Sequence, residues 1–365
     1  MSPKVSVIVG SYNNARFLPA CLDSLLHQTY ADFEVLVVDD CSNDHSLKIA
    51  QEYSRSDARI RVISTEKNEG VTNTKHLGLR AAEGEYVAIL DSDDVALPER
   101  LERQVAWLDS HLETVLVAGN YGIIDAEGKI IKRRKKVPRD DLSIRWWLTF
   151  GNCLIHSTVM YRRQPAVDNG AYDRYYFHGE DLDLYTKLLR VGKFAAIPEV
   201  VSLWRSHRAS VTKYVASEER ERYYIELVQR SIQWQIGQSV DLNVAAAVFY
   251  NTKRPAKGEM DFRAGIETLI YALSHFYQAV EGNKSDRKIL ARCYIQHLVR
   301  LRKRNKNQPW WPFGKAAWLR GLQFLVSEIG YRWYRDGKIW SHLPPMIWPH
   351  LIWPGRRGAA AIRKE

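Results

Sequence analysis

Three carboxylates lie close together directly after a short apolar run. The run covers residues 86–90, and Asp91, Asp93 and Asp94 follow within four residues. Closely packed carboxylates repel one another, and a divalent cation is the simplest group that stabilises them together. An acidic turn that caps a helix beginning near Pro98 explains the same residues. From this stretch alone, a cation site and a solvated cap remain equally open.

A second acidic turn follows another apolar run. Residues 33–38 precede Asp39 and Asp40, and the polar residues Ser11 and Tyr12 follow a comparable run at 5–9. Asp40 has an alternative role as a helix cap, which we favour less because Asp44 is already available for capping. Acidic or polar residues therefore follow three apolar runs of the first hundred residues.

The segments around these runs predict the elements that position the acids. We expect strands at 5–9, 33–38, 61–64 and 86–90, with helices at 15–27, at 72–82 and in the segment that ends at Tyr53. This alternation predicts an α/β fold with a mostly parallel sheet and helices on both of its faces. The carboxyl ends of such strands meet at one edge, so we expect a pocket for a polar ligand there.

A glycine-rich phosphate loop is missing from the sequence. Neither GxGxxG after the first apolar run nor GxxxxGK[ST] occurs. If a nucleotide binds at the acidic edge, a metal ion and side chains must hold its phosphates.

The next segment carries a run of cations. We expect a helix at 98–110, a hairpin formed by 115–124 and 129–132, and a strand at 153–161. Lys132–Lys136 is a solvated loop in the simplest interpretation, while contact with an anionic acceptor or with lipid headgroups is the alternative. The sequence does not decide between them.

Five segments, taken in order, closely resemble the family 2 glycosyltransferases with the GT-A fold. They are VSVIVGSYNN, FEVLVVDDCSND, NEGVTNTKHLGLRAAEGEY, ILDSDDVALPERL and HGEDLDLYTKLLR, and the resemblance covers about residues 3–212. It implies a Rossmann-like GT-A catalytic domain, here 1–215. It also implies inverting transfer of a sugar from a nucleotide-diphosphate sugar, with a UDP-sugar expected, to a hydroxyl of a growing saccharide or lipid-linked glycan, with Mn²⁺ or Mg²⁺ as cofactor.

The resemblance implies a role for individual residues on the donor side. Donor-binding residues would be Ser11, Tyr12, Asp40, Lys75, Asp91 and Arg205. Metal ligands would be Asp93 and His207. Three alternatives stay open: Lys75 as a solvated helix residue, His207 as an ordinary surface histidine, and Asp94 as a cap or a supporting group. Arg205 suits a diphosphate because its guanidinium fork matches phosphate oxygens.

The acceptor side is implied by the HGED segment and by the region near residue 152. The family match makes Asp181 the catalytic base, which takes the proton of the acceptor hydroxyl. A carboxylate in a first helical turn is also stabilised by the helix dipole alone, which is the simpler explanation of Asp181. Asn152, His156 and Glu180 are expected on the acceptor side.

Composition limits the setting of the protein. The four cysteines, Cys21, Cys41, Cys153 and Cys293, show neither CxxC nor CxxH spacing, so neither a zinc site nor a disulfide framework is predicted. No secretory signal is recognised at the N-terminus, and no apolar stretch reaches the roughly 18 residues of a membrane-spanning helix. We therefore expect a cytoplasmic protein.

The positive charge is concentrated at the C-terminal end. Residues 300–365 contain fourteen Lys and Arg against three acidic residues, which accounts for the net charge of +11, and seven of the twelve tryptophans. We expect a helical region at 216–308 and a basic, Trp- and Pro-rich amphipathic tail at 309–365. Such a tail is typical of an interfacial segment, so we expect attachment to the inner face of the cell membrane; a helix docked on the catalytic domain is the alternative. No nucleic-acid reader motif is present, and we expect no nucleic-acid partner.

Two other classes of function compete with the enzyme. A non-catalytic protein that binds nucleotide sugars or polysaccharide would keep the fold without the chemistry, but acids occupy every motif position. A membrane scaffold would depend mainly on the tail. The sequence favours the glycosyltransferase.

Overall fold

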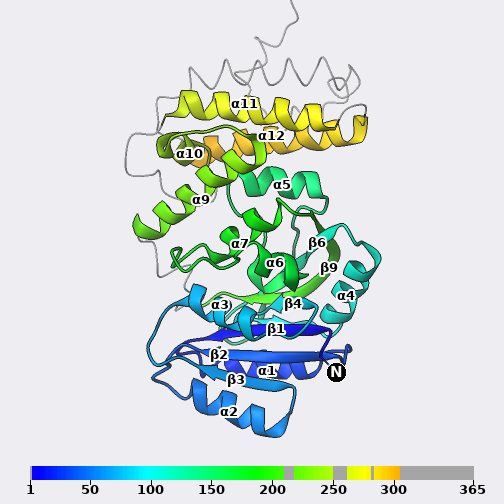
Figure 1. The fold of residues 1–365 in the computed structure, drawn as a ribbon, viewed down its shortest axis with the longest axis vertical. Helices are drawn as coiled ribbons and strands as arrows, with labels where there is room; N and C mark the ends of the chain where they lie inside the picture. The colour runs from blue at the N-terminus through cyan, green and yellow to red at the C-terminus, as the bar shows by residue number, and fades with distance from the viewer. Residues whose placement is uncertain (1, 209–217, 250–260, 281–282, 305–365) are drawn as a thin grey trace, which may run out of the picture. The chain divides into compact units, whose positions relative to one another are not determined.

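The structure, a computed structural model, describes residues 2–208, 218–249, 261–280 and 283–304. The chain divides into two compact units, residues 1–260 and 261–365. The described part of the first unit is built on a nine-stranded sheet with helices around it (Figure 1).

The sheet joins parallel and antiparallel strands. Its order is β3-β2-β1-β4-β8-β6-β9-β5, and β7 pairs with β6 outside this path. The strands are β1 Val5–Ser11, β2 Phe33–Asp39, β3 Ile60–Ser64, β4 Tyr86–Ile89, β5 Val95–Ala96, β6 Thr114–Ile124, β7 Ile130–Lys135, β8 Met160–Arg162 and β9 Lys193–Arg205. The first four strands in the order run parallel, as the alternation of strands and helices predicted.

Helices cover both faces of the parallel part. Those of the first unit are α1 Leu18–Leu26, α2 Ser46–Ser56, α3 Val71–Ala81, α4 Arg100–Ser110, α5 Asp141–Thr149, α6 Arg163–Asp168, α7 Glu180–Leu188, α9 Glu218–Ile236 and α10 Leu242–Val248, with a 3₁₀ turn η1 at His156–Thr158. Successive side chains of a strand point to opposite faces. Val7 of β1 accordingly packs with Leu22 of α1 and Leu101 of α4, while Ile8 contacts Gly78 of α3.

The register brings the carboxyl ends of three strands together. Val7 of β1 pairs with Val35 of β2 and Ala88 of β4, and Ser11 at the end of β1 lies opposite Asp39. The strands are apolar almost throughout because both faces are buried. The acidic turns after β2 and β4 therefore lie at the same edge as Ser11.

The prediction of a strand at 153–161 is wrong for most of these residues. Residues 156–158 form the 3₁₀ turn η1, and only Met160–Arg162 is a strand, β8. The hydroxyl of Thr158 donates to the carbonyl of Ile155 at 2.7 Å, and its N–H donates to the same oxygen. Short hydroxyl side chains bond to nearby backbone and compete with strand formation. The apolar composition alone did not show this turn.

The run Lys132–Lys136 is also not the loop expected in the simplest interpretation. Its first four residues belong to β7, which pairs antiparallel with β6 and extends beyond the predicted hairpin strand at 129–132. Residues Lys132, Arg133, Arg134 and Lys136 are exposed. The cations therefore lie on an ordered edge strand.

The predicted helical region is present in both units. In α9, Leu227, Val228, Ile232 and Ile236 are buried at the predicted spacing. The second unit contains α11 Phe262–Ala279 and α12 Lys284–Arg304, which pack on each other. The tail predicted at 309–365 lies outside the described residues, as do 209–217. Within the described ranges, no helix combines the length and the apolar character needed to cross a membrane.

Candidate active site

The acidic turn after β4 is fixed from several directions. The N–H of Asp94 donates to the carbonyl of Asp91 at 2.9 Å, which closes the turn, and the N–H of Asp91 donates to Ser157 Oγ at 3.0 Å. The side chain of Asn14, from the loop after β1, donates to Ser92 Oγ at 2.7 Å. Elements on both sides of β4 in the sheet thus hold the turn at the predicted edge.

Lys75 is an internal partner of the turn and not a solvated helix residue. Its side chain is 1 % exposed, and its Nζ lies 2.9 Å from Oδ1 of Asp91. Burial raises the pKa of Asp91, but the positive charges of Lys75 and His156 outweigh it and lower that pKa to about 2. Asp91 is therefore ionised at neutral pH, and its side chain remains 40 % exposed toward solvent.

Asp93 and His207 form the pair predicted to bind metal. Nε2 of His207 lies 2.8 Å from Oδ2 of Asp93, and the His207 ring packs 4.6 Å from the ring of Phe17. Within the described ranges, no three or more His, Cys, Asp or Glu side chains are grouped so as to hold a metal ion. A carboxylate and an imidazole side by side fit a divalent ion that takes its remaining ligands from water and substrate phosphates.

Arg205 ties the acidic turn to the hairpin of β6 and β7. Its N–H donates to Oδ1 of Asp94 at 2.8 Å, and its Nε donates to the carbonyl of Asp93 at 2.7 Å. Its Nη1 donates to the carbonyls of Asp125 and Ala126 at 3.1 and 3.3 Å. The guanidinium is thus engaged with backbone oxygens at the edge of the site; the phosphate contact predicted for it stays a prediction.

A buried arginine below the turn was missed from the sequence. Arg100 is 1 % exposed and donates to the carbonyls of Ile89 and Val159 at 2.7 and 3.2 Å. Asp94, also 1 % exposed, has its pKa raised by burial and by the negative charges of Asp93 and Asp91. The sequence does contain an indication of this burial, because Arg100 and Gln104 lie on the same helical face as the apolar residues of α4.

The carboxylate of Asp40 holds the loop that precedes α3. Its Oδ1 accepts from the N–H of Glu69 at 2.9 Å and from Thr65 Oγ1 at 3.1 Å, while its Oδ2 accepts from the N–H of Gly70 at 2.7 Å. Asp40 is only 2 % exposed. It does not cap α2, so the capping alternative is wrong; the contact with a nucleotide base stays a prediction.

The last residue of β1 and the residue that follows it lie beside Asp40. Tyr12 is 45 % exposed, and the buried hydroxyl of Ser11 makes no hydrogen bond within the described structure. The N–H of Asp40 donates to the carbonyl of Ser11 at 2.9 Å, so these residues share one corner of the sheet edge. An exposed aromatic ring next to an unpaired hydroxyl suits a planar, polar ligand.

Asp181 lies in the first turn of α7, after Gly179 in the left-handed conformation with φ of 93°. Its Oδ2 accepts from the side chain of Asn152 at 2.5 Å, and its Oδ1 accepts from the N–H of Leu182 at 2.7 Å. Burial and the neighbouring charge of Glu180 raise the pKa of Asp181 to about 6. A carboxyl with such a pKa accepts a proton readily near neutral pH.

Glu180 has the opposite environment. Its Oε1 lies 3.8 Å from Nδ1 of His156, and this contact lowers the pKa of Glu180 against the effect of burial. Nε2 of His156 lies 3.0 Å from the hydroxyl of Tyr172, which in turn accepts from Tyr161. His156 is buried and affects both Glu180 and Asp91 by its charge; the acceptor-side role predicted for it stays a prediction. Two adjacent carboxyls pushed to different pKa values are typical of acid/base chemistry.

Comparisons with known proteins identify the family of the chain. The sequence model of "Glycosyl transferase family 2" matches residues 6–169. A putative glycosyltransferase, EpsE of Bacillus subtilis, is 33 % identical over 195 residues, which are 52 % of this chain and 68 % of EpsE. The amylovoran biosynthesis glycosyltransferase AmsE of Erwinia amylovora is 29 % identical over 221 residues, which are 58 % of this chain and 82 % of AmsE.

Solved structures show the same fold. S. aureus TarS 1–349 in complex with UDP-GlcNAc superposes with a TM-score of 0.55 at 20 % identity, covering 92 % of both chains. The mannosyltransferase PcManGT from Pyrobaculum calidifontis, in complex with GDP-Man and Mn²⁺, gives a TM-score of 0.51 at 18 % identity and covers 88 % of both chains. At these identities the likeness concerns the fold.

Proposed function

The chain belongs to glycosyl transferase family 2, and from this membership we propose that it transfers a sugar from a nucleotide-diphosphate sugar to an acceptor hydroxyl by one inverting, metal-assisted displacement. The protein is a glycosyltransferase with the GT-A fold. The observation that carries the proposed mechanism is the partly buried carboxyl of Asp181, whose pKa is about 6.

Asp181 is the proposed general base. In an inverting displacement the acceptor hydroxyl attacks the anomeric carbon while a base takes its proton. Asn152 holds the carboxylate through Oδ2, and the N–H of Leu182 holds it through Oδ1, so the base is oriented before the acceptor arrives. Glu180 stays ionised beside His156, and its negative charge keeps the pKa of Asp181 high enough for proton transfer.

Asp93 and His207 are the proposed metal-binding residues. A bound Mn²⁺ or Mg²⁺ would supply Lewis-acid stabilisation to the charge that develops on the leaving diphosphate. Arg205 donates to the backbone carbonyl of Asp93 and also to the carbonyls of Asp125 and Ala126. Through these contacts it holds Asp93 in place relative to the hairpin of β6 and β7. Lys75 keeps Asp91 ionised, so the donor meets a carboxylate there and not a neutral acid.

Ser11, Tyr12 and Asp40 are the proposed contacts of the nucleotide. They share the corner after β1 and β2, and Tyr12 offers an exposed ring. A UDP-sugar is the proposed donor. Structures of TarS with UDP and UDP-GlcNAc support a uridine nucleotide, whereas PcManGT binds GDP-Man.

A growing saccharide or lipid-linked glycan is the proposed acceptor, and the name of AmsE, a glycosyltransferase of amylovoran biosynthesis, supports this. We also propose peripheral attachment to the inner face of the cell membrane, which the basic tail 309–365 predicts from its sequence alone. Separating membrane and soluble fractions of cells that express the chain with and without residues 310–365 tests this attachment.

The transfer itself is tested with variants of the base. The full chain is screened for thermal stabilisation by a panel of nucleotide sugars with Mn²⁺, because a bound donor raises the apparent stability. With the stabilising donor and a saccharide mixture as acceptor, Asp181→Asn is expected to lose transfer but keep the stabilisation. Asp168→Asn, on the exposed side of α6, is the matched control. Unchanged turnover in Asp181→Asn would refute the mechanism.

A further inference from the structure

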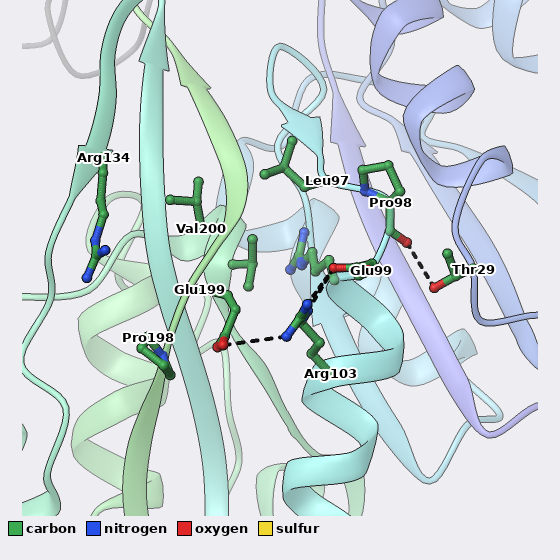
Figure 2. Close-up of a pocket in the computed structure, with 11 residues that line it drawn as sticks. Thr29, Leu97, Pro98, Glu99, Arg103, Arg134, Pro198, Glu199 and Val200 are labelled. Carbon is green, nitrogen blue, oxygen red and sulfur yellow. Dashed lines mark hydrogen bonds and ion pairs between the residues drawn. The ribbon is translucent and has the colours of Figure 1, made fainter.

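A groove lies between β9 and α4, next to the segment that follows β5. Its volume is about 680 Å³, within the range of small-molecule sites. Figure 2 shows Arg134 of β7 on one side and Arg103 of α4 on the other, with Pro198–Val200 of β9 between them. We call this hollow the side groove.

The walls of the side groove mix apolar and charged groups. Leu97, Pro98, Pro198 and Val200 supply apolar surface. Arg103 lies 2.6 Å from Glu99 and 3.5 Å from Glu199, so these two carboxylates share one cation (Figure 2). Such walls offer acceptors for hydroxyl groups, a guanidinium for an anion and flat surface for C–H groups.

The basic run, Lys132–Lys136, borders the side groove through Arg134. Within the described residues, no ion pair joins any of these five cations to a carboxylate. By contrast, Arg61 and Arg103 each contact two carboxylates. Unpaired cations in a row produce a local positive potential that attracts anions.

The strand that carries the basic run is joined to the active site. The turn before β7 includes Asp125 and Ala126, whose carbonyls accept from Arg205, and Arg205 also donates to the carbonyl of Asp93. Arg16, in the loop after β1, contacts Glu127 of the same turn at 3.2 Å. A ligand that follows β7 toward this turn therefore arrives beside Asp93.

We propose that the basic run and the side groove form a distal binding surface for an acceptor saccharide chain that carries carboxylate or phosphate groups. The cations of β7 bind its anionic groups, and Glu99 and Glu199 accept hydrogen bonds from its hydroxyls. This inference rests on the proposed function, because it assigns the acceptor class of the same enzyme. The growing end of the chain lies at Asp181, and the part already made lies along the groove.

A saccharide fits this surface better than the other polyanions do. A bilayer presents a broad, flat surface, whereas the lining of the side groove is hollowed between β9 and α4. A nucleic acid presents phosphates along its whole length and few hydroxyl donors for those carboxylates. A polysaccharide provides both anions and hydroxyls and is narrow enough for a groove.

The experiment compares charge variants of the full chain. The test variant is Lys132→Gln/Arg133→Gln/Arg134→Gln/Lys136→Gln, and the control variant is Lys48→Gln/Arg55→Gln/Lys284→Gln/Lys288→Gln, which removes the same charge from exposed positions on α2 and α12. Binding of a fluorescent polygalacturonate oligomer is measured by anisotropy, with a neutral maltooligosaccharide as second probe. Both variants keep the basic tail, so its contribution cancels.

We expect the oligomer to bind the unmodified chain and the control equally, and to bind the test variant about tenfold more weakly, because several exposed charge pairs are lost. Val200→Trp, which fills the side groove without a change of charge, is expected to weaken binding as well. The neutral oligomer is expected to bind at least tenfold more weakly than the anionic one.

Three outcomes would overturn the inference. The first is undiminished binding of the anionic oligomer to the test variant, and the second is equal binding of the neutral oligomer. The third is that phosphatidylglycerol vesicles or DNA of equal charge bind more tightly than the anionic oligomer and depend on the basic run in the same way. Thermal stabilisation by the donor is measured in parallel. If a nucleotide sugar stabilises the chain but binding of the oligomer does not depend on the basic run, only the acceptor inference fails. If no nucleotide sugar stabilises the unmodified chain, the proposed function fails.

Discussion

His207 Nε2 contacts Asp93 Oδ2 at 2.8 Å across 114 positions of the chain. His207 lies two residues after the end of β9, and the contact joins it to the acidic turn after β4. Arg205, the last residue of β9, binds the same turn through Asp93 and Asp94. Three bonds from one short segment therefore determine where the predicted metal ligands lie. Sequence proximity contributes nothing to this arrangement.

Removing His207 is expected to weaken metal binding more than donor binding. In His207→Ala, the imidazole beside Asp93 is removed, so we expect the Mn²⁺ concentration for half-maximal transfer to rise at least tenfold. His27→Ala, on the exposed end of α1, is the control. The measurement is a Mn²⁺ titration of activity at saturating donor, and an unchanged midpoint in His207→Ala would show that this residue is no metal ligand.

The pH dependence of transfer is expected to report Asp181. The base must be deprotonated to accept a proton, and its pKa is about 6, so kcat/KM should rise as the pH rises through about 6 and level off above it. Glu180→Gln removes the negative charge that raises this pKa. We therefore expect the midpoint of the profile to move to lower pH in that variant.

The residual activity of Asp181→Asn adds a second measure of the same group. General-base catalysis is typically worth about 10²- to 10⁴-fold, so the variant should lose at least about 10²-fold in kcat. A midpoint that stays in place when Glu180 is neutralised would contradict the assignment, because Glu180 raises the pKa of Asp181 through its charge.

Lys75→Met is expected to lower stability in a way that depends on pH. The pKa of Asp91 is about 2 in the folded protein, below the ordinary value of about 4, so the pair stabilises the fold above pH about 4 and this contribution disappears as the pH falls through about 2. Because Asp91 is 40 % exposed, we expect a loss of only about 1 kcal/mol at pH 7.

Urea unfolding at pH 7, 4 and 3 measures this difference, with Lys48→Met on exposed α2 as control. The gap between Lys75→Met and the unmodified protein should narrow from pH 4 to pH 3. A gap that is the same at all three values would mean that packing of the lysine stem, and not the ion pair, stabilises the protein.

Gly70→Ala is expected to affect both stability and donor binding. Gly70 has φ of 88°, and a Cβ there would lie 2.3 Å from Cε2 of Phe177. Gly128 has nearly the same φ, 84°, but its nearest neighbour would be 3.8 Å away. Gly128→Ala should therefore lower the free energy of unfolding by about 1–2 kcal/mol, because of the left-handed backbone alone. Gly70→Ala should lower it by more, because the added Cβ also meets the ring of Phe177.

Thermal unfolding of the two variants measures the difference, and the double variant Gly70→Ala/Phe177→Ala should recover part of it because the ring is removed. The N–H of Gly70 donates to Asp40, so Gly70→Ala should also reduce stabilisation by the nucleotide sugar, whereas Gly128→Ala should not. Equal losses of stability in both glycine variants would exclude the ring contact as a cause.

The parallel half of the fold was predictable because its signals are local. The apolar runs at 5–9, 33–38 and 86–90 alternate with helical patterns, and each run became a buried strand within a residue or two of the expected bounds. The strand prediction for 153–161 failed because the hydroxyl of Thr158 bonds to the carbonyl of Ile155 within a tight turn, and Ser157 Oγ accepts from the N–H of Asp91, which is distant in sequence. Such bonds depend on the neighbouring elements.

The site was predictable in its acids but not in its supports. Asp93 and Asp181 were proposed because they belong to ordered motifs, and the structure brings each beside another residue of the predicted site, His207 and Asn152 respectively. Arg100 was missed because a lone arginine near the start of a helix is usually solvated. Its burial is decided by carbonyls of β4 and of the residue before β8, which only the folded chain brings together.

One hydrogen-bonded sheet runs from β3 to β5, and β8 is inserted between β4 and β6. The nucleotide half and the half that carries Asp181 are therefore not separable modules, and a chimera that exchanges residues 114–205 with a relative would have to rebuild the pairing of β8 with β4 and of β9 with β5. Engineering of sugar or acceptor choice in this enzyme should instead graft the connections at 125–129 and 173–178, which lie outside the strands.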